Sequence, residues 1–212
     1  MKFDLLRLGE PVRREVLAAA AWRRFDRGVV LFHEGEAGGS LHVLMHGRVA
    51  VRVTTPDGYT VTLNVIGPGT AFGELSMLDP ATMRTATVQA IEPVQTLVLQ
   101  RADFERLRRS HPSVDQLLVE YLAAQVRRLS ERLTEALCLE ARTRVLRRLL
   151  ELDAVFDSGP VLVTQEEIST MAGTTRPTVN RVMQDLAEAG IVELGRGRFV
   201  VVDSAALARA AR

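Results

Sequence analysis

The chain has few of the residues that build disulfide bonds, metal clusters and haem sites. Only one of its 212 residues is cysteine, so Cys138 cannot form an intrachain disulfide, and we expect it to be a small packing residue between domains. An iron–sulfur cluster, which needs about four thiolates, is excluded. His33, His42, His46 and His111 could ligate haem iron, but each is better explained as a surface or core histidine. We therefore expect no metal, haem or cluster.

Long apolar runs and lysine are scarce as well. No run approaches the roughly 18 residues of a membrane span, and charges interrupt residues 1–10, where a signal peptide would need an apolar core. Lys2 is the only lysine among 27 basic residues, and arginine suits bidentate contacts to phosphate and guanine. The net charge of +1 does not indicate a domain that coats nucleic acid without specificity. We expect a soluble cytoplasmic protein with no membrane partner.

Enzyme motifs are also missing. The chain has no His-Glu-x-x-His sequence, and the glycines of residues 67–73 lack dinucleotide-binding spacing. A barrel with an acidic pocket could belong to a cupin-like oxygenase, but His42 with His46 lacks the carboxylate that such a metal site needs. The sequence therefore predicts a protein that is not an enzyme, with a cupin-like enzyme as a distant alternative.

Short β-branched runs, separated by glycines and turn residues, fill residues 29–99. Runs of this spacing indicate an antiparallel barrel or jelly roll, with Pro56-Asp57-Gly58 as a hairpin turn. Apolar residues at helical spacing predict a helical lead-in over residues 4–27. The expected strands are 29–32, 41–45, 49–53, 61–66, 86–89 and 95–99.

Residues 112–138 contain no glycine, and no proline after Pro112. Their apolar residues recur every three or four positions, which predicts one long helix with a seam. The stripe could pack against its own domain, but the adjoining barrel needs only part of it, and charged residues flank it as they do in dimer helices, which favours a homodimer. The seam consists of Val114, Leu118, Leu122, Val126, Leu129, Leu133 and Leu137.

Residues 164–202 have the order of a winged helix-turn-helix. A capping box at Thr164-Gln-Glu-Glu167 opens a short helix, Gly173 supplies the turn, and a second helix covers 176–189. Two strands within 191–202 form the expected wing. Arginines in the first turns of such a helix can pair with guanine, although two arginines on a solvated helix face are the simpler alternative. The expected DNA contacts are Thr174, Thr175, Arg176, Thr178, Asn180 and Arg181.

Gly73-Glu74-Leu75, followed by Arg84-Thr85, gathers the groups needed to hold one phosphate and one ribose. Gly73 lets the backbone approach an anion, Arg84 offers a charged fork to phosphate oxygens, and Glu74 can accept a hydrogen bond from a sugar hydroxyl. The alternative is a plain turn at Gly73 with a strand-end salt bridge between Glu74 and Arg84.

These residues resemble the phosphate-binding cassette of the cyclic AMP receptor protein (CRP/FNR) family of bacterial regulators, and the resemblance covers nearly the whole chain. It implies that Gly73, Glu74, Leu75, Arg84 and Thr85 hold the cyclic phosphate and the ribose 2′-hydroxyl. The second helix of residues 164–202 resembles the family's recognition helix. There Arg176 and Arg181 match, whereas Pro177 replaces a glutamate and cannot accept a hydrogen bond from cytosine.

The resemblance also concerns how the base of the cyclic nucleotide is contacted. Family members that bind cyclic AMP contact adenine through a polar pair on the dimer helix and use an upstream arginine. Ungapped extension from Arg84-Thr85 puts Leu129-Ser130 at the pair and Gln125 at the arginine, so only Ser130 is kept. The resemblance implies a cyclic purine nucleotide, cyclic AMP first of all, as effector. A regulator that responds to another ligand, or needs none, is the alternative.

The expected fold is α+β in three parts. Residues 1–111 form a double-stranded β-helix (jelly-roll) sensor domain that binds the cyclic nucleotide, 112–138 the dimerisation helix, and 139–212 the winged helix-turn-helix domain. The partners that this implies are a second copy of the chain, palindromic double-stranded DNA and RNA polymerase. The loop at 157–160 is a candidate contact for the polymerase.

Overall fold

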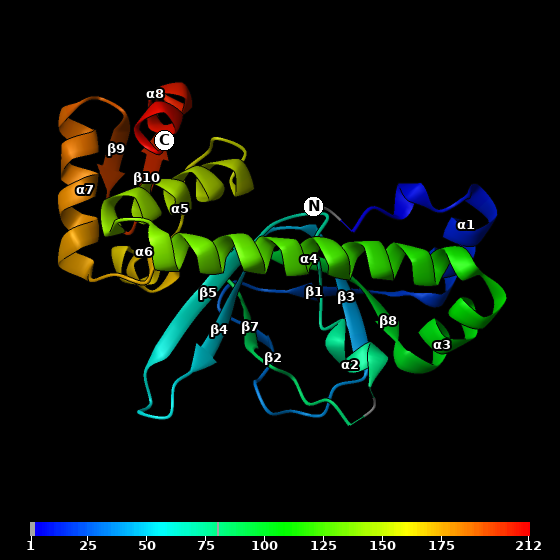
Figure 1. Ribbon diagram of the computed structural model, residues 1–212. Helices are drawn as coiled ribbons and strands as arrows, with labels where there is room; N and C mark the ends of the chain where they lie inside the picture. Colours follow the sequence, from blue (N-terminus) through cyan, green and yellow to red (C-terminus); the bar gives the residue numbers. More distant parts are fainter. Residues whose placement is uncertain (1–2, 80) are drawn as a thin grey trace. The chain divides into compact units, whose positions relative to one another are not determined.

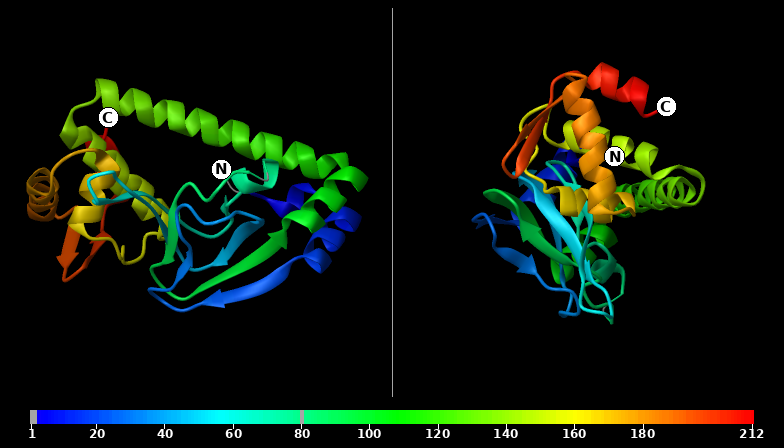
Figure 2. Two further views of the ribbon diagram at one scale, coloured as in Figure 1. Left: turned by 90° about the horizontal axis from the view of Figure 1, so that it is seen from below. Right: turned by 90° about the vertical axis from the view of Figure 1, so that its left-hand side faces the viewer.

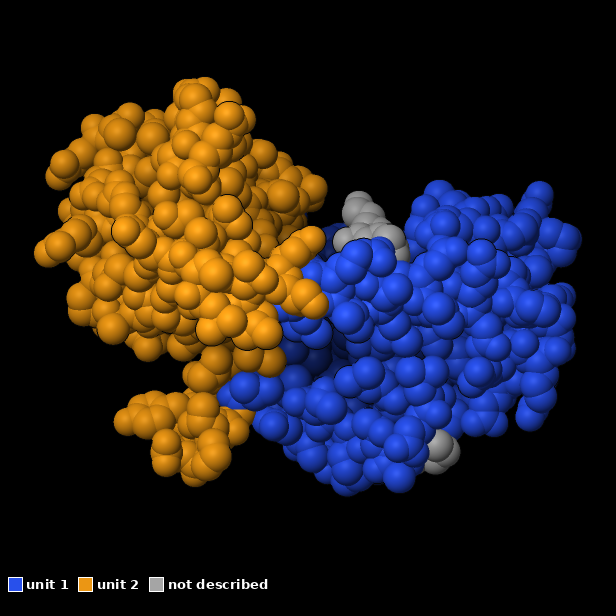
Figure 3. Space-filling model, viewed as in Figure 1, with its two compact units in different colours: residues 1–53, 66–129 blue, residues 54–65, 130–212 orange. Residues whose placement is uncertain are grey.

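The computed structural model describes residues 3–79 and 81–212. Contacts divide the chain into two compact units, coloured separately in Figure 3. Unit 1 comprises residues 1–53 and 66–129, and unit 2 comprises residues 54–65 and 130–212. The hairpin segment 54–65 is thus grouped with residues 130–212 in unit 2, which the sequence alone does not predict.

The strands within residues 21–100 form two sheets with antiparallel pairs, as predicted. One sheet has the order β1-β8-β3-β6 and the other the order β2-β7-β4-β5. The six predicted strands are present within one or two residues of their expected bounds, whereas β1 and β6 were not predicted. The strands are β1 (Ala21–Phe25), β2 (Val30–Phe32), β3 (Ser40–His46), β4 (Val49–Thr54), β5 (Thr60–Ile66), β6 (Ala71–Phe72), β7 (Thr87–Ala90) and β8 (Val94–Gln100).

The predicted helical lead-in over residues 4–27 is correct only for its first part. A 3-10 turn (η1, Leu5–Arg7) and helix α1 (Glu10–Ala19) are followed by strand β1, which pairs with β8 along its whole length. The error has a physical cause, because β1 is an edge strand whose first four residues are exposed. No alternation of buried and exposed residues marks it, and its pairing with β8 is non-local.

Helices close unit 1 at one end. Figures 1 and 2 show α1 beside α3 (Arg101–Ser110), which leads into the long helix α4 (Pro112–Cys138). In the first half of α4, Val114, Leu117, Leu118 and Tyr121 are buried. They belong to a core cluster with residues of α1, α3, β3 and β8. The predicted long helix is therefore present, and its first half packs on its own unit.

The second half of α4 exposes the apolar seam. Val126, Leu129 and Leu133 are between 61% and 64% exposed, and Leu137 is 77% exposed. Apolar side chains repeated along one helix and left in water are expected to be covered by a partner. Cys138, the last residue of α4, is also exposed, so the prediction that it is a packing residue is wrong for the single chain.

The C-terminal part of unit 2 is a winged helix-turn-helix. Thr164 and Glu167 form the predicted capping box, Gly173 ends α6 with a φ of 59°, and Thr175 caps α7. Helix α7 buries Val179, Val182, Met183 and Leu186 against the domain. The elements are α5 (Ala141–Val155), α6 (Gln165–Ala172), α7 (Arg176–Glu188), β9 (Val192–Gly195), β10 (Arg198–Val201) and α8 (Ser204–Ala210).

No helix within the described residues is both long and apolar enough to cross a bilayer.

Candidate functional site

The segment from β6 to β7 turns sharply around Gly73. Gly73 has a φ of 79°, a left-handed conformation, and a short helix α2 (Leu75–Leu78) follows, with Glu74 as its N-cap. A side chain at Gly73 would clash with the guanidinium group of Arg84 and the carbonyl oxygen of Ser40. Glycine is therefore needed both for the backbone conformation and for the close approach of Arg84.

Arg84 lies at the centre of this site, with 7% of its surface exposed. Its Nη1 donates to the carbonyl oxygens of Ser40 (2.9 Å) and Gly73 (3.2 Å) and to Ser76 Oγ (3.2 Å). Its Nη2 donates to Ser40 Oγ at 2.8 Å. The guanidinium carbon lies 4.1 Å from the centre of the Phe32 ring. The group is therefore held by the ring on one face and by hydrogen bonds at both Nη1 and Nη2.

One edge of the Arg84 guanidinium keeps unused donors. The buried Nε has no hydrogen-bond partner among the described residues, and Nη2 has one acceptor for its two hydrogens. Nε–H and one Nη2–H point along the same edge, and that edge matches two oxygens of a phosphate. Burial lowers the pKa of Arg84, and the carboxylates of Glu36 and Glu74 act in the opposite direction. The site is a cationic fork with two donors left for an anion.

Glu74 lies next to this fork but does not neutralise it. Burial raises the pKa of Glu74 above its ordinary value. Among the described residues, the hydrogen bonds of the Arg84 side chain go to Ser40, Gly73 and Ser76 and not to Glu74, which argues against the alternative of a strand-end salt bridge. Leu75, the first residue of α2, is 43% exposed, and Thr85 is exposed just before β7.

Gln125 reaches this region through a buried tyrosine. Its Nε2 donates to Tyr121 Oη at 2.9 Å, and Tyr121 Oη donates to the carbonyl oxygen of Ala71, two residues before Gly73, at 2.6 Å. Burial and then the charge of Glu74 raise the pKa of Tyr121. Unit 1 contains the predicted residues Gly73, Glu74, Leu75, Arg84, Thr85 and Gln125. Ser130 belongs to unit 2, where its carbonyl oxygen accepts from Thr134 Oγ1 at 3.0 Å.

Four residues that surround Arg84 escaped the sequence-based prediction as members of the site. Ser40 and Ser76 accept its hydrogen bonds, Phe32 stacks on it, and His42 lies behind Ser40. Ser40 and Arg84 are 44 residues apart, and only the closure of the sheets brings them into contact. A local motif contains no signal for such a partner.

The second candidate surface is on unit 2. Thr175 Oγ1 accepts from the backbone N–H of Thr178, and the two hydroxyl groups lie 3.0 Å apart, at the start of α7. Arg176, Pro177, Asn180 and Arg181 are exposed there. A groove between α7 and the wing is lined by Arg176, Gly195, Gly197 and Arg198, among others. Exposed arginines on both α7 and the wing suit the phosphates and base edges of DNA.

Arg196 and Arg198 of the wing are candidates that the sequence-based set did not include. Both are exposed on the β9–β10 hairpin, and Gly197 between them has a φ of 69°. The signal was present, since Gly195-Arg196-Gly197-Arg198 combines turn residues with two cations. A wing of this kind lies beside the recognition helix and can contact the backbone phosphates.

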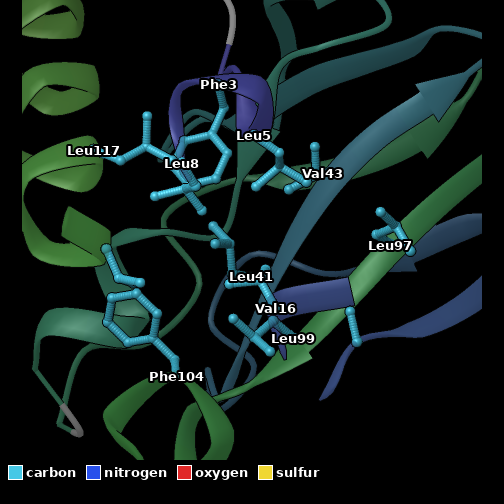
Figure 4. A pocket seen from close by; sticks show the side chains of 12 residues that line it. Phe3, Leu5, Leu8, Val16, Leu41, Val43, Leu97, Leu99, Phe104 and Leu117 are labelled. Carbon is cyan, nitrogen blue, oxygen red and sulfur yellow. The ribbon is translucent and has the colours of Figure 1, made fainter. Parts of the chain in front are cut away.

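Within the described residues, no group of three or more His, Cys, Asp or Glu side chains could hold a metal ion. His42 is buried, whereas His33 and His46 are exposed. A further pocket in unit 1 is lined by twelve apolar residues, including Phe3, Leu41 and Phe104 (Figure 4). These residues belong to the core cluster or pack against it, and the pocket offers no polar side chain to orient a nucleotide.

Comparison with known proteins identifies relatives of this chain. The model of the cyclic nucleotide-binding domain matches residues 22–111, and that of the Crp-like helix-turn-helix domain matches residues 143–210. A cyclic AMP receptor protein from Thermus thermophilus is 37% identical over 186 residues, which cover 87% of this chain and 85% of that protein. A CRP-like cAMP-activated global transcriptional regulator from Mycobacterium tuberculosis is 33% identical over 195 residues, 89% of this chain and 87% of that protein. The crystal structure of the Thermus thermophilus catabolite activator protein matches with 34% identity and a TM-score of 0.57, covering 96% of this chain and 95% of that one.

Proposed function

The chain belongs to the CRP/FNR family of DNA-binding transcription regulators, which are not enzymes, and on this premise we propose that it regulates transcription in response to cyclic AMP. The nucleotide would bind in unit 1 and the DNA on unit 2. The observation that carries the proposal is the buried Arg84 guanidinium, whose Nε–H has no partner among the described residues.

In the proposed complex the cyclic phosphate takes the free edge of Arg84. A buried donor without an acceptor is unfavourable, and a phosphodiester oxygen would satisfy it with a charge-assisted hydrogen bond. Gly73 lets the Arg84 guanidinium approach its backbone, and Glu74 would accept from the ribose 2′-hydroxyl. Leu75 and Thr85 complete the proposed phosphate and ribose contacts, and Gln125 is held nearby by Tyr121.

The preference for cyclic AMP is the finer part of the proposal. It is supported by the two relatives named above, whose names refer to cyclic AMP. Leu129 is 64% exposed and has no polar side-chain atom, so Ser130 is the remaining polar candidate for adenine. A different cyclic nucleotide, or activity without any ligand, is the alternative, because Arg84 recognises the phosphate and not the base.

The exposed seam of α4 supports a homodimer. Val126, Leu129, Leu133 and Leu137 would pack against the same residues of a second copy, as in other two-stranded helix pairs. In this proposal residues 1–111 sense the nucleotide, 112–138 join the two copies, and 139–212 bind DNA.

The dimer would present two copies of α7 to a two-fold symmetric DNA site. The two recognition helices must then lie about 34 Å apart, one turn of DNA, for both to enter the major groove. Arg176 and Arg181 are the proposed base-reading residues, supported by Thr174, Thr175, Thr178 and Asn180. DNA and RNA polymerase as partners would place the protein in the cytoplasm, with residues 157–160 as a candidate polymerase contact.

Binding-site selection from random duplexes tests this proposal. The full chain is incubated with the pool in three parallel reactions, with cyclic AMP, with cyclic GMP and with no nucleotide. We expect a two-fold symmetric site to be enriched only with cyclic AMP. Equal enrichment in all three reactions would identify a regulator that needs no ligand, and enrichment of no sequence would contradict the DNA-binding role.

A further inference from the structure

Ser40 and His42 lie behind the anion site and form a hydrogen-bonded series with Arg84. We propose that these two side chains are positioning residues for Arg84, and that His42 acts through Ser40 to aim the free guanidinium edge at the ligand. The inference rests on the proposed function, because it concerns the affinity of the same site for a cyclic nucleotide. We call the hydrogen-bonded series Arg84, Ser40, His42 the Ser40–His42 relay.

The geometry of the relay is continuous. Arg84 Nη2 lies 2.8 Å from Ser40 Oγ, and Ser40 Oγ lies 3.2 Å from His42 Nε2. On the far side of the ring, His42 Nδ1 lies 3.5 Å from Thr96 Oγ1. His42 and Thr96 are both buried, with 6% and 0% of their surfaces exposed. The imidazole also stacks on Phe72, with ring centres 5.1 Å apart and an angle of 17° between the planes.

The donors of the guanidinium group fix the direction of the first hydrogen bond in the relay. A guanidinium group can only donate, so Ser40 Oγ accepts from Arg84 and its own proton is available for His42. In the proposed relay that proton goes to His42 Nε2, so the neutral ring carries its own proton on Nδ1, facing Thr96. Burial and the charge of Arg84 lower the pKa of His42 to about 4, which agrees with a neutral ring.

The relay restricts how Arg84 can rotate. Nη1 is held by two carbonyl oxygens and Ser76 Oγ, but the Nη2 side has Ser40 Oγ as its one acceptor among the described residues. If His42 did not take the Ser40 proton, the hydroxyl could turn and direct that proton at the guanidinium. The relay therefore keeps Nη2 in place and leaves Nε–H and the second Nη2–H for the ligand.

A double-mutant cycle on the full chain tests the relay, with cyclic AMP as the probe and calorimetry as the readout. Ser40→Ala removes the acceptor, and His42→Phe keeps an aromatic ring against Phe72 but cannot accept a proton. Each should weaken cyclic AMP binding about three- to tenfold, the effect of one hydrogen bond. Since His42 acts through Ser40, the double variant should bind no more weakly than Ser40→Ala. Ser40→Thr, which keeps the hydroxyl, should restore the wild-type affinity.

The outcomes separate the relay from the proposed function. Unchanged affinity in both single variants, or effects that multiply in the double variant, would overturn the relay while leaving the nucleotide site intact. If the wild type binds neither cyclic AMP nor cyclic GMP, the proposed function fails instead. The nitrogen-15 spectrum of the wild-type imidazoles then still decides the relay, with the His42 signals assigned by their loss in His42→Phe. A proton on Nδ1 at neutral pH is expected, and a proton on Nε2 would overturn the relay even if a variant failed to fold.

Discussion

At the scale of single residues, Arg84 is the group on which the proposed nucleotide site depends most. It is the buried cation of the segment, and its Nη1 is already occupied by three acceptors within unit 1. The remaining donors, Nε–H and one Nη2–H, form the edge that is left for an anion. Loss of the guanidinium should therefore remove the donors for the ligand and also leave the acceptors of Nη1 unpaired, so the fold of such a variant has to be checked.

Arg84→Leu is expected to weaken cyclic AMP binding at least tenfold. The loss of a charge-assisted contact to phosphate costs roughly 1.5 to 3 kcal/mol of binding free energy. Calorimetry gives the affinity, and circular dichroism checks that the variant is folded. Arg52→Leu, a substitution of a half-buried arginine on β4, is the matched control and should bind normally. Unchanged cyclic AMP binding by Arg84→Leu would refute the assignment of this pocket.

His42 should make the stability of unit 1 depend on pH. Its pKa falls from 6.5 to about 4 in the folded chain, so the unfolded chain binds a proton at higher pH than the folded one. The contribution of the neutral His42 to the free energy of unfolding is complete above pH 6.5 and is lost as the pH falls towards 4. Between pH 7 and pH 5 the wild type should lose about 2 kcal/mol of unfolding free energy from this group. In urea titrations, His42→Phe should lack that part of the decrease, and equal decreases in both proteins would show that His42 is not held neutral.

The residues of the nucleotide site differ in how far the sequence could predict them. Gly73, Glu74 and Arg84 lie close together in the chain, and a turn glycine followed by a lone arginine is a local pattern. Ser40 and His42 lie on another strand, and their contact with Arg84 depends on the register and closure of the sheets. Serine and histidine are common in strands, so no local feature marked them as support for the cation.

At the scale of secondary structure elements, α4 combines two kinds of surface. Its first half is buried in unit 1, whereas the later seam residues are more than 60% exposed. The sequence predicted the helix because its apolar residues recur at helical spacing. The spacing could not tell which of them would pack within the chain, since Val114 and Leu133 follow the same pattern.

Leu133→Asp is expected to convert a dimer into a monomer. The substitution puts a charge into the seam of both copies, where no cation of the same helix would face it, and association should fail at micromolar concentration. Sedimentation equilibrium measures the mass, and Arg127→Asp, at an exposed polar position of α4, is the control. If Leu133→Asp remains a dimer, the seam is not the subunit interface.

Helix α7 gives a second prediction at this scale. Arg181→Ala should weaken binding to the selected DNA site by about 1 to 3 kcal/mol and relax the preference at one base pair in each half-site. Gln184→Ala replaces an exposed residue one turn further along the helix and should change neither the DNA affinity nor the base preference. The measurement is site selection on the wild type and both variants. A contact to phosphate alone would weaken all sequences alike, and identical site preferences would exclude α7 as the base-reading helix.

Strand β1 marks the limit of prediction from local patterns. Its sequence, Ala21-Trp22-Arg23-Arg24-Phe25, follows a helix directly and has four exposed residues in succession. Its conformation is determined by pairing with β8, some 70 residues later in the chain, from Ala21 with Val98 to Phe25 with Val94. By contrast, the capping box and Gly173 of the helix-turn-helix are local signals, and these were predicted correctly.

At the scale of the whole molecule, the proposed function requires that nucleotide and DNA binding depend on each other. The proposed nucleotide residues other than Ser130 lie in unit 1, and the proposed DNA-reading residues lie in unit 2. Helix α4 contributes residues to both units. A ligand can shift the DNA affinity only if it binds the DNA-competent form more tightly than the other form. The same coupling must then appear in reverse, as tighter cyclic AMP binding in the presence of the DNA site.

The most direct test is a fluorescence anisotropy titration of a labelled palindromic duplex with the full chain, with and without saturating cyclic AMP. Coupling of the usual size predicts that cyclic AMP raises the DNA affinity about 5- to 150-fold in the wild type, and that Arg84→Leu shows no such increase. Cyclic GMP serves as the matched nucleotide and should have a smaller effect. The same DNA affinity with and without cyclic AMP in the wild type would contradict regulation by this ligand.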